Sequence, residues 1–216
     1  MPRIPVRQLA VVLSLIIVSG CVSNPPTRRI WVEPRVNLKT YETIGMVEFS
    51  STSKGALAAL TTRKFAEAAR RDQDMLRMIE VGSQKAALAA AGQNQWNPES
   101  CKAIGRKHGV HTLFYGTLTL SKVRPTVQIS ALLNSGQVTA NVEATLEVQM
   151  IEVETGASIW SRSASSTRTL GQVSVFGGRD YVFDAVDPEA AYGDLVDSLV
   201  AQVAQDFQGS WQTQTQ

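Results

Sequence analysis

The sequence lacks the motifs that mark the common catalytic, nucleotide-binding and metal sites. It contains no GxSxG, Walker loop, GxGxxG, HExxH or paired CxxC pattern, so hydrolase, nucleotide-binding and structural-zinc sites lose their usual support. Charged residues are few, at 19%, while 44% of the residues are hydrophobic. This composition excludes a disordered or collagen-like chain and allows one ordinary globular domain. We therefore expect no catalytic residue, no cofactor and no metal ion.

Excess charge is also absent once the amino terminus is set aside. Arg3 and Arg7 lie in a segment without acids, and residues 21–216 carry 19 basic and 19 acidic side chains. A chain of zero net charge has no overall attraction for polyanions. The composition therefore predicts no nucleic-acid partner, although the pI of the full sequence is near 8.6.

The main apolar stretch is too short to cross a membrane as a helix. It covers residues 9–18 and falls far short of the roughly 20 residues that a spanning helix requires. It follows Arg3 and Arg7 and precedes small residues, which is typical of a cleaved export signal. We predict a lipoprotein signal peptide over residues 1–20.

The end of this signal, Val18-Ser19-Gly20-Cys21, resembles the bacterial lipobox. In that motif the cysteine sulfur receives a diacylglyceryl group, and the freed amine receives an acyl chain such as palmitate. Two or three acyl chains anchor a protein stably, at about 0.8 kcal/mol per buried methylene. By similarity to lipoprotein sorting in Gram-negative bacteria, Val22 in place of aspartate favours the outer membrane. The sequence thus predicts lipidation at Cys21 and a protein on the periplasmic face of the outer membrane.

Cysteine and histidine are scarce in the mature chain. Once the Cys21 sulfur is a thioether, Cys101 has no partner for an intramolecular disulfide, so a buried thiol is expected. Cys101, His108 and His111 have side chains that could bind zinc. No fourth ligand is near in the sequence, and we expect one histidine at a helix end and the other in a strand.

The mature chain divides into a tether, one domain and a short tail. Residues 21–40 contain Pro25, Pro26 and Pro34 without an apolar period, which predicts an acylated flexible tether. The domain extends over residues 41–210, and residues 211–216 are expected to be a polar tail. Periodicity and capping signals in the domain predict strands at 43–49, 75–81 and 110–120 and helices at 55–71, 83–91 and 98–108.

The strongest periodic signal runs from Val138 to Met150, where hydrophobic and polar residues alternate without a break. Such alternation predicts a strand with one buried face. A Thr-Gly turn at 154–156 joins it to a second strand reaching about Leu170, and a last helix opens at Pro188. The order of elements predicts an α/β fold, in which a mixed β-sheet is packed with helices in a single domain.

The two halves of the mature chain have opposite charge. Residues 21–124 contain 16 basic and 8 acidic side chains, and residues 125–216 contain 3 and 11. Two interpretations are open. The halves can interleave in the fold and neutralise each other, or a positive face on one copy can meet a negative face on the next and close a ring. In the second case, Asp194 and Asp197 are candidates for the contact between copies.

Two segments, residues 103–118 and 142–161, carry a resemblance to a known family. The first is the end of a basic helix followed by a hydrophobic strand with a glycine. The second is an alternating strand, a Thr-Gly turn and a strand with Trp160-Ser161. Together they resemble the CsgG-like superfamily of outer-membrane lipoproteins, which includes the curli channel CsgG, LpoB-type activators and TolB N-terminal-domain-like proteins. The resemblance implies an anticodon-binding-domain-like α/β fold, no enzymatic activity, and work through protein contacts.

The departures from that family concern two hairpin stretches. In the curli channel the corresponding insertions cross the bilayer, whereas residues 121–136 and 171–186 are too short to do so. These stretches are either ordinary surface hairpins or a flap that inserts shallowly in a membrane or docks on a partner. The residues expected to make that contact are Val175, Phe176, Tyr181 and Phe183.

These features lead to one main hypothesis and two alternatives. The main hypothesis is a non-enzymatic outer-membrane lipoprotein that oligomerises or docks on another envelope protein as an accessory of a secretion or assembly system. The first alternative is a curli-type export pore. The second is an LpoB-like activator of a peptidoglycan synthase, although residues 21–40 form too short an arm to cross the peptidoglycan. The expected partners are the membrane, through the lipid anchor, further copies of the chain, and an envelope protein.

Overall fold

The computed structural model describes residues 27–129, 136–171, 174–176, 180–183 and 185–215. These residues fall into two compact units. The larger unit, residues 33–210, holds a six-stranded mixed sheet, a three-stranded sheet and the helices, and is the single α/β domain that the sequence predicts. The smaller unit is a two-stranded ribbon made of β1 and β11.

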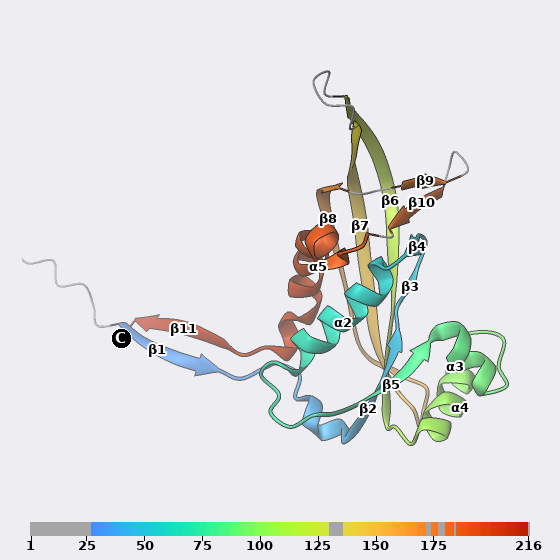
Figure 1. The fold of residues 1–216 in the computed structure, drawn as a ribbon. Helices are drawn as coiled ribbons and strands as arrows, with labels where there is room; N and C mark the ends of the chain where they lie inside the picture. Colours follow the sequence, from blue (N-terminus) through green and yellow to red (C-terminus); the bar gives the residue numbers. More distant parts are fainter. Residues whose placement is uncertain (1–26, 130–135, 172–173, 177–179, 184, 216) are drawn as a thin grey trace, which may run out of the picture. The chain divides into compact units, whose positions relative to one another are not determined.

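The main sheet has the strand order β5-β2-β6-β7-β8, and the short strand β3 also pairs with β6 (Figure 1). β2 is parallel to β5 and β6, whereas β7 is antiparallel to β6 and β8. The strands are β2 (Thr43–Glu48), β3 (Ser50–Ser51), β5 (Arg77–Ser83), β6 (Thr112–Ile129), β7 (Gly136–Glu152) and β8 (Ser158–Gly171). The mixed sheet confirms the predicted fold class.

The helices begin at the caps that the sequence indicates. Asn97 accepts a hydrogen bond of 2.7 Å from the backbone of Ser100, and Asp187 accepts one of 3.1 Å from Ala190. Each cap is followed by a proline at the first turn, where no backbone N–H is needed. The helices are η1 (Leu38–Tyr41), α2 (Leu57–Arg70), α3 (Gln84–Ala90), α4 (Pro98–His108), α5 (Pro188–Val203) and η2 (Ala204–Phe207).

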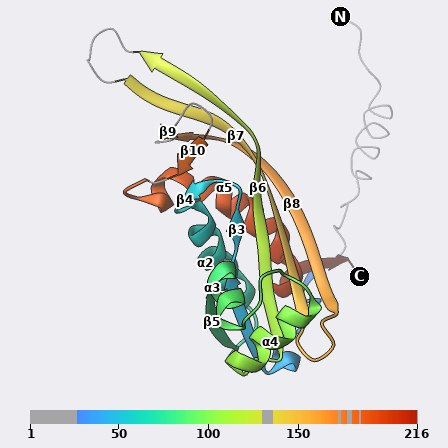
Figure 2. The ribbon, with the colours of Figure 1, turned by 90° about the vertical axis from the view of Figure 1, so that its right-hand side faces the viewer.

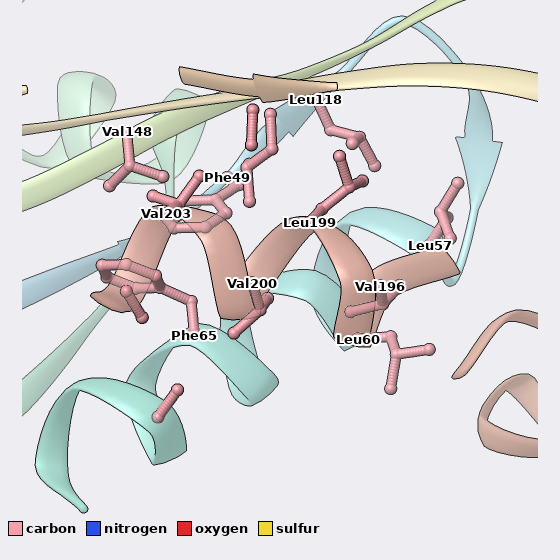
Figure 3. Packing of buried hydrophobic residues seen from close by; sticks show 14 of the residues in the cluster. Phe49, Leu57, Leu60, Phe65, Leu118, Val148, Val196, Leu199, Val200 and Val203 are labelled. Atoms are coloured by element: carbon pink, nitrogen blue, oxygen red, sulfur yellow. The ribbon is translucent and has the colours of Figure 1, made fainter. Parts of the chain in front are cut away.

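The main core lies between the sheet and the helices α2 and α5 (Figures 2 and 3). On β7, the alternate residues from Ala140 to Met150 are fully buried, which confirms the predicted strand with one buried face. Phe65 of α2 contacts Phe49 and Phe114, with ring centroids 5.4 and 5.3 Å apart. Truncation of such an aromatic side chain costs about 3–5 kcal/mol, so this cluster holds the helices on the sheet.

A second, smaller core lies on the other face of the sheet, under α3 and α4. Successive strand residues point to opposite faces, and on β6 Phe114 belongs to the main core whereas Leu113 belongs to the second. Cys101 and Ile104 of α4 pack in this second core. Where the helices end, the face is polar, as at the 2.8 Å hydrogen bond between the hydroxyls of Thr145 and Ser165.

The hairpin of β6 and β7 is longer than the predicted strands. Its pairing continues past a register shift between Leu120 and Lys122 and reaches the pair Ile129 and Gly136. The stretch 121–136 therefore belongs, where it is described, to strands that continue from the core. The paired ends of β6 and β7 extend beyond the rest of the domain in both ribbon views (Figures 1 and 2).

The segments expected to be a tether and a tail contain strands. β1 (Thr27–Val32) lies in the first and β11 (Ser210–Thr215) covers most of the second. The folded domain also begins earlier than residue 41, because Gln73 accepts a hydrogen bond of 2.8 Å from the backbone of Leu38 and donates one of 2.8 Å to the carbonyl of Phe207. This buried glutamine joins the first turn of the domain to its last.

Candidate docking surface

Cys21, the predicted lipidation site, lies outside the described residues, so its acylation stays a prediction. Residues 22–26 separate it from Thr27, the first described residue. Within the described ranges, none of the helices is both long and apolar enough to cross a membrane.

The stretch 171–186, expected to be a surface hairpin or a flap, forms a small sheet of its own. β9 (Ser174–Phe176) and β10 (Asp180–Phe183) are antiparallel, and β10 is parallel to β4 (Lys54–Gly55), which directly precedes α2. The hairpin is thus attached to the domain through β4 (Figure 1).

Phe183, one of the four residues predicted to contact a partner or membrane, is part of the hydrophobic core instead. Its side chain is fully buried, and its ring meets that of Tyr192 on α5 at 5.6 Å and 71°. A buried side chain offers no surface to a partner, so the prediction is wrong for Phe183. The sequence grouped Phe183 with the other apolar residues of this stretch, but it did not indicate that this position packs against α5.

The junction below the hairpin depends on a close backbone approach at Gly55. The Ala56 amide donates a hydrogen bond of 2.7 Å to the Phe183 carbonyl. A Cβ atom at Gly55 would lie 2.2 Å from that same carbonyl oxygen, and the φ angle of Gly55 is +101°. Glycine is therefore required here both for its conformation and for its size.

The other three predicted contact residues lie on the hairpin strands. Val175 and Phe176 belong to β9, and Tyr181 belongs to β10, where it pairs with Val175 in the backbone register. Their contact with a partner or a membrane stays a prediction. The structure places all three beyond the buried Phe183, on a hairpin whose base is held by the core.

Opposite charges meet between α2 and α5 of the same chain. Lys64 forms ion pairs with both Glu189 and Asp197, the second at 2.9 Å, and Arg63 pairs with Glu189 at 2.9 Å. Hydrogen bonds to Glu189 and then Asp197 raise the pKa of Lys64. For these residues the basic and acidic halves of the sequence interleave within one molecule, which is the first of the two interpretations above.

A second polar cluster gathers around Asp206 in η2. Its carboxylate accepts hydrogen bonds of 2.7 Å from Arg162 and 3.2 Å from the Trp160 indole, and it pairs with Arg35 at 3.4 Å. Burial alone would raise the pKa of Asp206, but the hydrogen bonds from Trp160 and Arg162 and the two positive charges lower it. The cluster connects β8 to the end of the domain and has a structural role.

Cys101, His108 and His111 occupy separate environments. Cys101 is a buried thiol, as expected, and burial raises its pKa to about 11. His108 is the last residue of α4, and His111 lies just before β6, with Nε2 at 3.5 Å from a carboxylate oxygen of Glu42. No group of three or more metal-ligating side chains is found in the part of the chain that the structure describes.

The exposed tryptophans of the β1–β11 ribbon were missed by the sequence analysis. Trp31 and Trp211 meet edge to face, with ring centroids 5.4 Å apart at 62°. The Arg29 guanidinium carbon lies 5.7 Å from the centroid of the Trp211 ring. The available signal was a tryptophan in each of the two segments that were assigned to the tether and the tail.

Comparison with known proteins identifies similar structures and no similar sequence. No protein-family model matches the chain, and no curated protein matches it. The PelC dodecamer from Paraburkholderia phytofirmans is similar at 14% identity with a TM-score of 0.45, over 85% of this chain and 98% of that chain. The LpoB C-terminal domain from Escherichia coli is similar at 15% identity with a TM-score of 0.35, over 74% and 94%.

A third similar structure is the lipoprotein GNA1162 from Neisseria meningitidis. It has 15% identity and a TM-score of 0.35, over 59% of this chain and 83% of that chain. At these identities the likeness concerns the fold alone.

Proposed function

We propose that the chain is a non-enzymatic lipoprotein of the outer membrane, facing the periplasm, and that it acts as an accessory of an envelope secretion or assembly system by docking or by oligomerising. The observation that carries the proposal is the lipobox Val18-Ser19-Gly20-Cys21 between an export signal and an α/β domain. A domain held on a bilayer by acyl chains can work on partners in the same compartment without a spanning segment. Membership of the CsgG-like superfamily is part of this proposal and depends on residues 103–118 and 142–161.

The hairpins that leave the core support the docking part of the proposal. The β6–β7 hairpin continues from the sheet, and the β9–β10 hairpin is held at its base by the buried Phe183 and by the hydrogen bond from Ala56. Loops and hairpins on a rigid scaffold commonly carry binding residues. The β9–β10 hairpin would present Val175, Phe176 and Tyr181 to a partner.

The oligomeric part of the proposal depends on fewer residues than the charge pattern indicated. Asp197 already pairs with Lys64 in its own chain, so a contact between copies through Asp197 would break an existing ion pair. Asp194 is exposed on α5 and is the better candidate for a contact with a positive face of the next copy.

The first experiment is mass spectrometry of the mature protein, followed by light scattering of the acylated protein in mild detergent. Acyl chains on Cys21 and outer-membrane fractionation are expected, and an unmodified cysteine would overturn the lipoprotein proposal. A discrete multimer, also formed by a Cys21→Ser control, would favour the oligomeric form, and a monomer in both would favour the docking form. Conductance in planar bilayers would instead favour an export pore, and stimulation of a peptidoglycan synthase would favour an activator.

A further inference from the structure

The β1–β11 ribbon exposes large aromatic surface. It contains two of the four tryptophans of the chain, and Trp31 and Trp211 remain 39% and 59% exposed although they contact each other. Arg29 and Trp31 are two positions apart on β1, so they share a face of the strand, and both lie beside Trp211. One face of the ribbon therefore combines two indole rings with a guanidinium group.

The described residues of the ribbon carry positive charge only. Arg28 and Arg29 lie on β1, and no acidic residue occurs in 27–32 or 211–215. The mature chain as a whole is neutral, so this is a local excess. A surface that combines exposed indole rings with arginines and no acid matches an interface between hydrocarbon and anionic headgroups.

A two-stranded ribbon also needs a partner to be stable. An isolated pair of strands is marginally stable at best in water, because it has too little apolar surface to bury. The ribbon has no third strand among the described residues. Contact of its aromatic face with another surface would bury Trp31 and Trp211 and supply the missing stabilisation.

The number of residues between Cys21 and β1 limits which surfaces the ribbon can reach. Only residues 22–26 separate Cys21 from Thr27, and a fully extended segment of this length spans at most about 20 Å. If Cys21 is held in the membrane by acyl chains, the start of β1 cannot leave the neighbourhood of the headgroups.

We propose that the β1–β11 ribbon lies on the bilayer in which Cys21 is anchored, with Trp31 and Trp211 at headgroup depth and Arg29, which lies on the same face, on anionic phospholipid headgroups. This inference rests on the lipid anchor proposed above. Tryptophan prefers this depth because its ring is apolar and its N–H group is polar, and arginine binds phosphate with several donors. Backbone groups at the ribbon edges stay hydrated at this depth, whereas they would be unpaired in hydrocarbon.

The test uses acylated protein in vesicles of phosphatidylethanolamine and phosphatidylglycerol whose acyl chains carry bromine, which quenches tryptophan at contact. The tryptophan fluorescence of the wild-type protein is expected to fall. The largest possible loss is the fraction contributed by Trp31 and Trp211, two of its four tryptophans. The Trp31→Phe/Trp211→Phe variant should lose this quenching while it still floats with the vesicles, because its acyl chains are intact. Trp96 and Trp160, which remain in the variant, are the internal control.

A second variant tests the charge without changing the rings. In a Cys21→Ser background, Arg29→Gln should lower partitioning into the anionic vesicles about fivefold, since an arginine near an anionic surface adds about 1 kcal/mol of attraction. Arg70→Gln, at an exposed position in the last turn of α2, is the matched control and should leave partitioning unchanged. Vesicles of phosphatidylcholine alone should remove the difference between the two variants.

The outcomes distinguish failure of the ribbon proposal from failure of the lipid-anchor proposal. Acylated protein that floats with the vesicles but is not quenched would overturn the ribbon proposal and leave the anchor in place. If Cys21 carries no acyl chain, the anchor fails, and quenching of the Cys21→Ser chain on anionic vesicles then supports or overturns the ribbon proposal by itself. A smaller multimer mass in the tryptophan variant, without quenching in the wild type, would show a second copy on the ribbon and overturn the membrane assignment.

Discussion

Arg162 donates a hydrogen bond of 2.7 Å to the carboxylate of Asp206, and this contact joins the middle of β8 to η2. The same carboxylate accepts from the Trp160 indole. Because Trp160 also packs against Phe207 at 4.6 Å, the polar contact and the aromatic contact hold the same two elements together.

We expect Asp206→Asn to destabilise the domain by about 1–3 kcal/mol at neutral pH, because Arg162 and Arg35 lose the ionised carboxylate with which they pair. The pKa of Asp206 is lowered in the folded state, so its stabilising effect is present above the unfolded value of about 4 and is lost as pH falls through the folded value. Urea unfolding at neutral and acid pH measures both effects.

The Asp206→Asn variant should lose less stability on acidification than the wild type. The control is Asp194→Asn, which changes an exposed carboxylate on α5 and should behave as the wild type does. Equal acid sensitivity of wild type and Asp206→Asn would contradict this role.

Substitution of Gly55 should be far more harmful than substitution of another glycine with a similar backbone. Gly55 and Gly82 have φ angles of +101° and +92°, but a Cβ at Gly55 would meet the Phe183 carbonyl whereas one at Gly82 would meet nothing within 4 Å. Gly82→Ala should cost about 1–2 kcal/mol from backbone conformation alone. Gly55→Ala should cost about 2–5 kcal/mol, because the steric clash adds to it. Thermal unfolding of both variants measures the difference, and similar losses would show that the junction can relax.

Cys101 should react slowly with thiol reagents in the folded protein. Burial raises its pKa from 9.0 to about 11, which lowers the thiolate fraction near neutral pH about 100-fold, and the thiolate is the reactive form. Labelling with an aromatic disulfide reagent before and after denaturation measures this protection. The denatured acylated protein should release one equivalent of chromophore, because Cys21 is then a thioether, and the Cys21→Ser protein should also release one. Rapid labelling of the folded chain would refute the buried environment.

Charge reversal at two neighbouring positions of α5 should have different effects. Asp197→Lys removes an ion pair with Lys64 and places two positive charges together, so we expect a loss of stability that Lys64→Glu in the same chain restores. Asp194→Lys should leave the fold unchanged and lower the multimer mass at low salt, where screening of exposed charges is weak. Light scattering and thermal unfolding of the three variants separate the two effects. An unchanged multimer mass in Asp194→Lys would remove this residue from any contact between copies.

Elements with one buried face could be predicted from the sequence, because burial of one face requires hydrophobic residues at a regular spacing. The alternation from Val138 to Met150 indicated β7, and Asn97 followed by Pro98 indicated the start of α4. These signals are local, since each strand or helix meets the core with a fixed period and each cap satisfies its own backbone.

Features that depend on distant partners could not be predicted in the same way. Trp31 and Trp211 lie at opposite ends of the chain, and neither β1 nor β11 has an apolar alternation to mark it. The burial of Phe183 depends on Tyr192 and on the close approach of Gly55. Likewise, the ion pairs of Lys64 with Glu189 and Asp197 depend on the contact between α2 and α5, which no local pattern contains.

The pairing of β1 with β11 also sets an order of events during biosynthesis. Among the described elements, β1 comes first and β11 comes last in the sequence, so the ribbon cannot close until all the described elements between them have been synthesised. Closure of a loop that contains the whole domain is also slow compared with local pairing. The ribbon therefore forms only on chains that extend through β11, and products truncated before β11 would be recognisable by an unpaired β1 close to the predicted lipidation site Cys21.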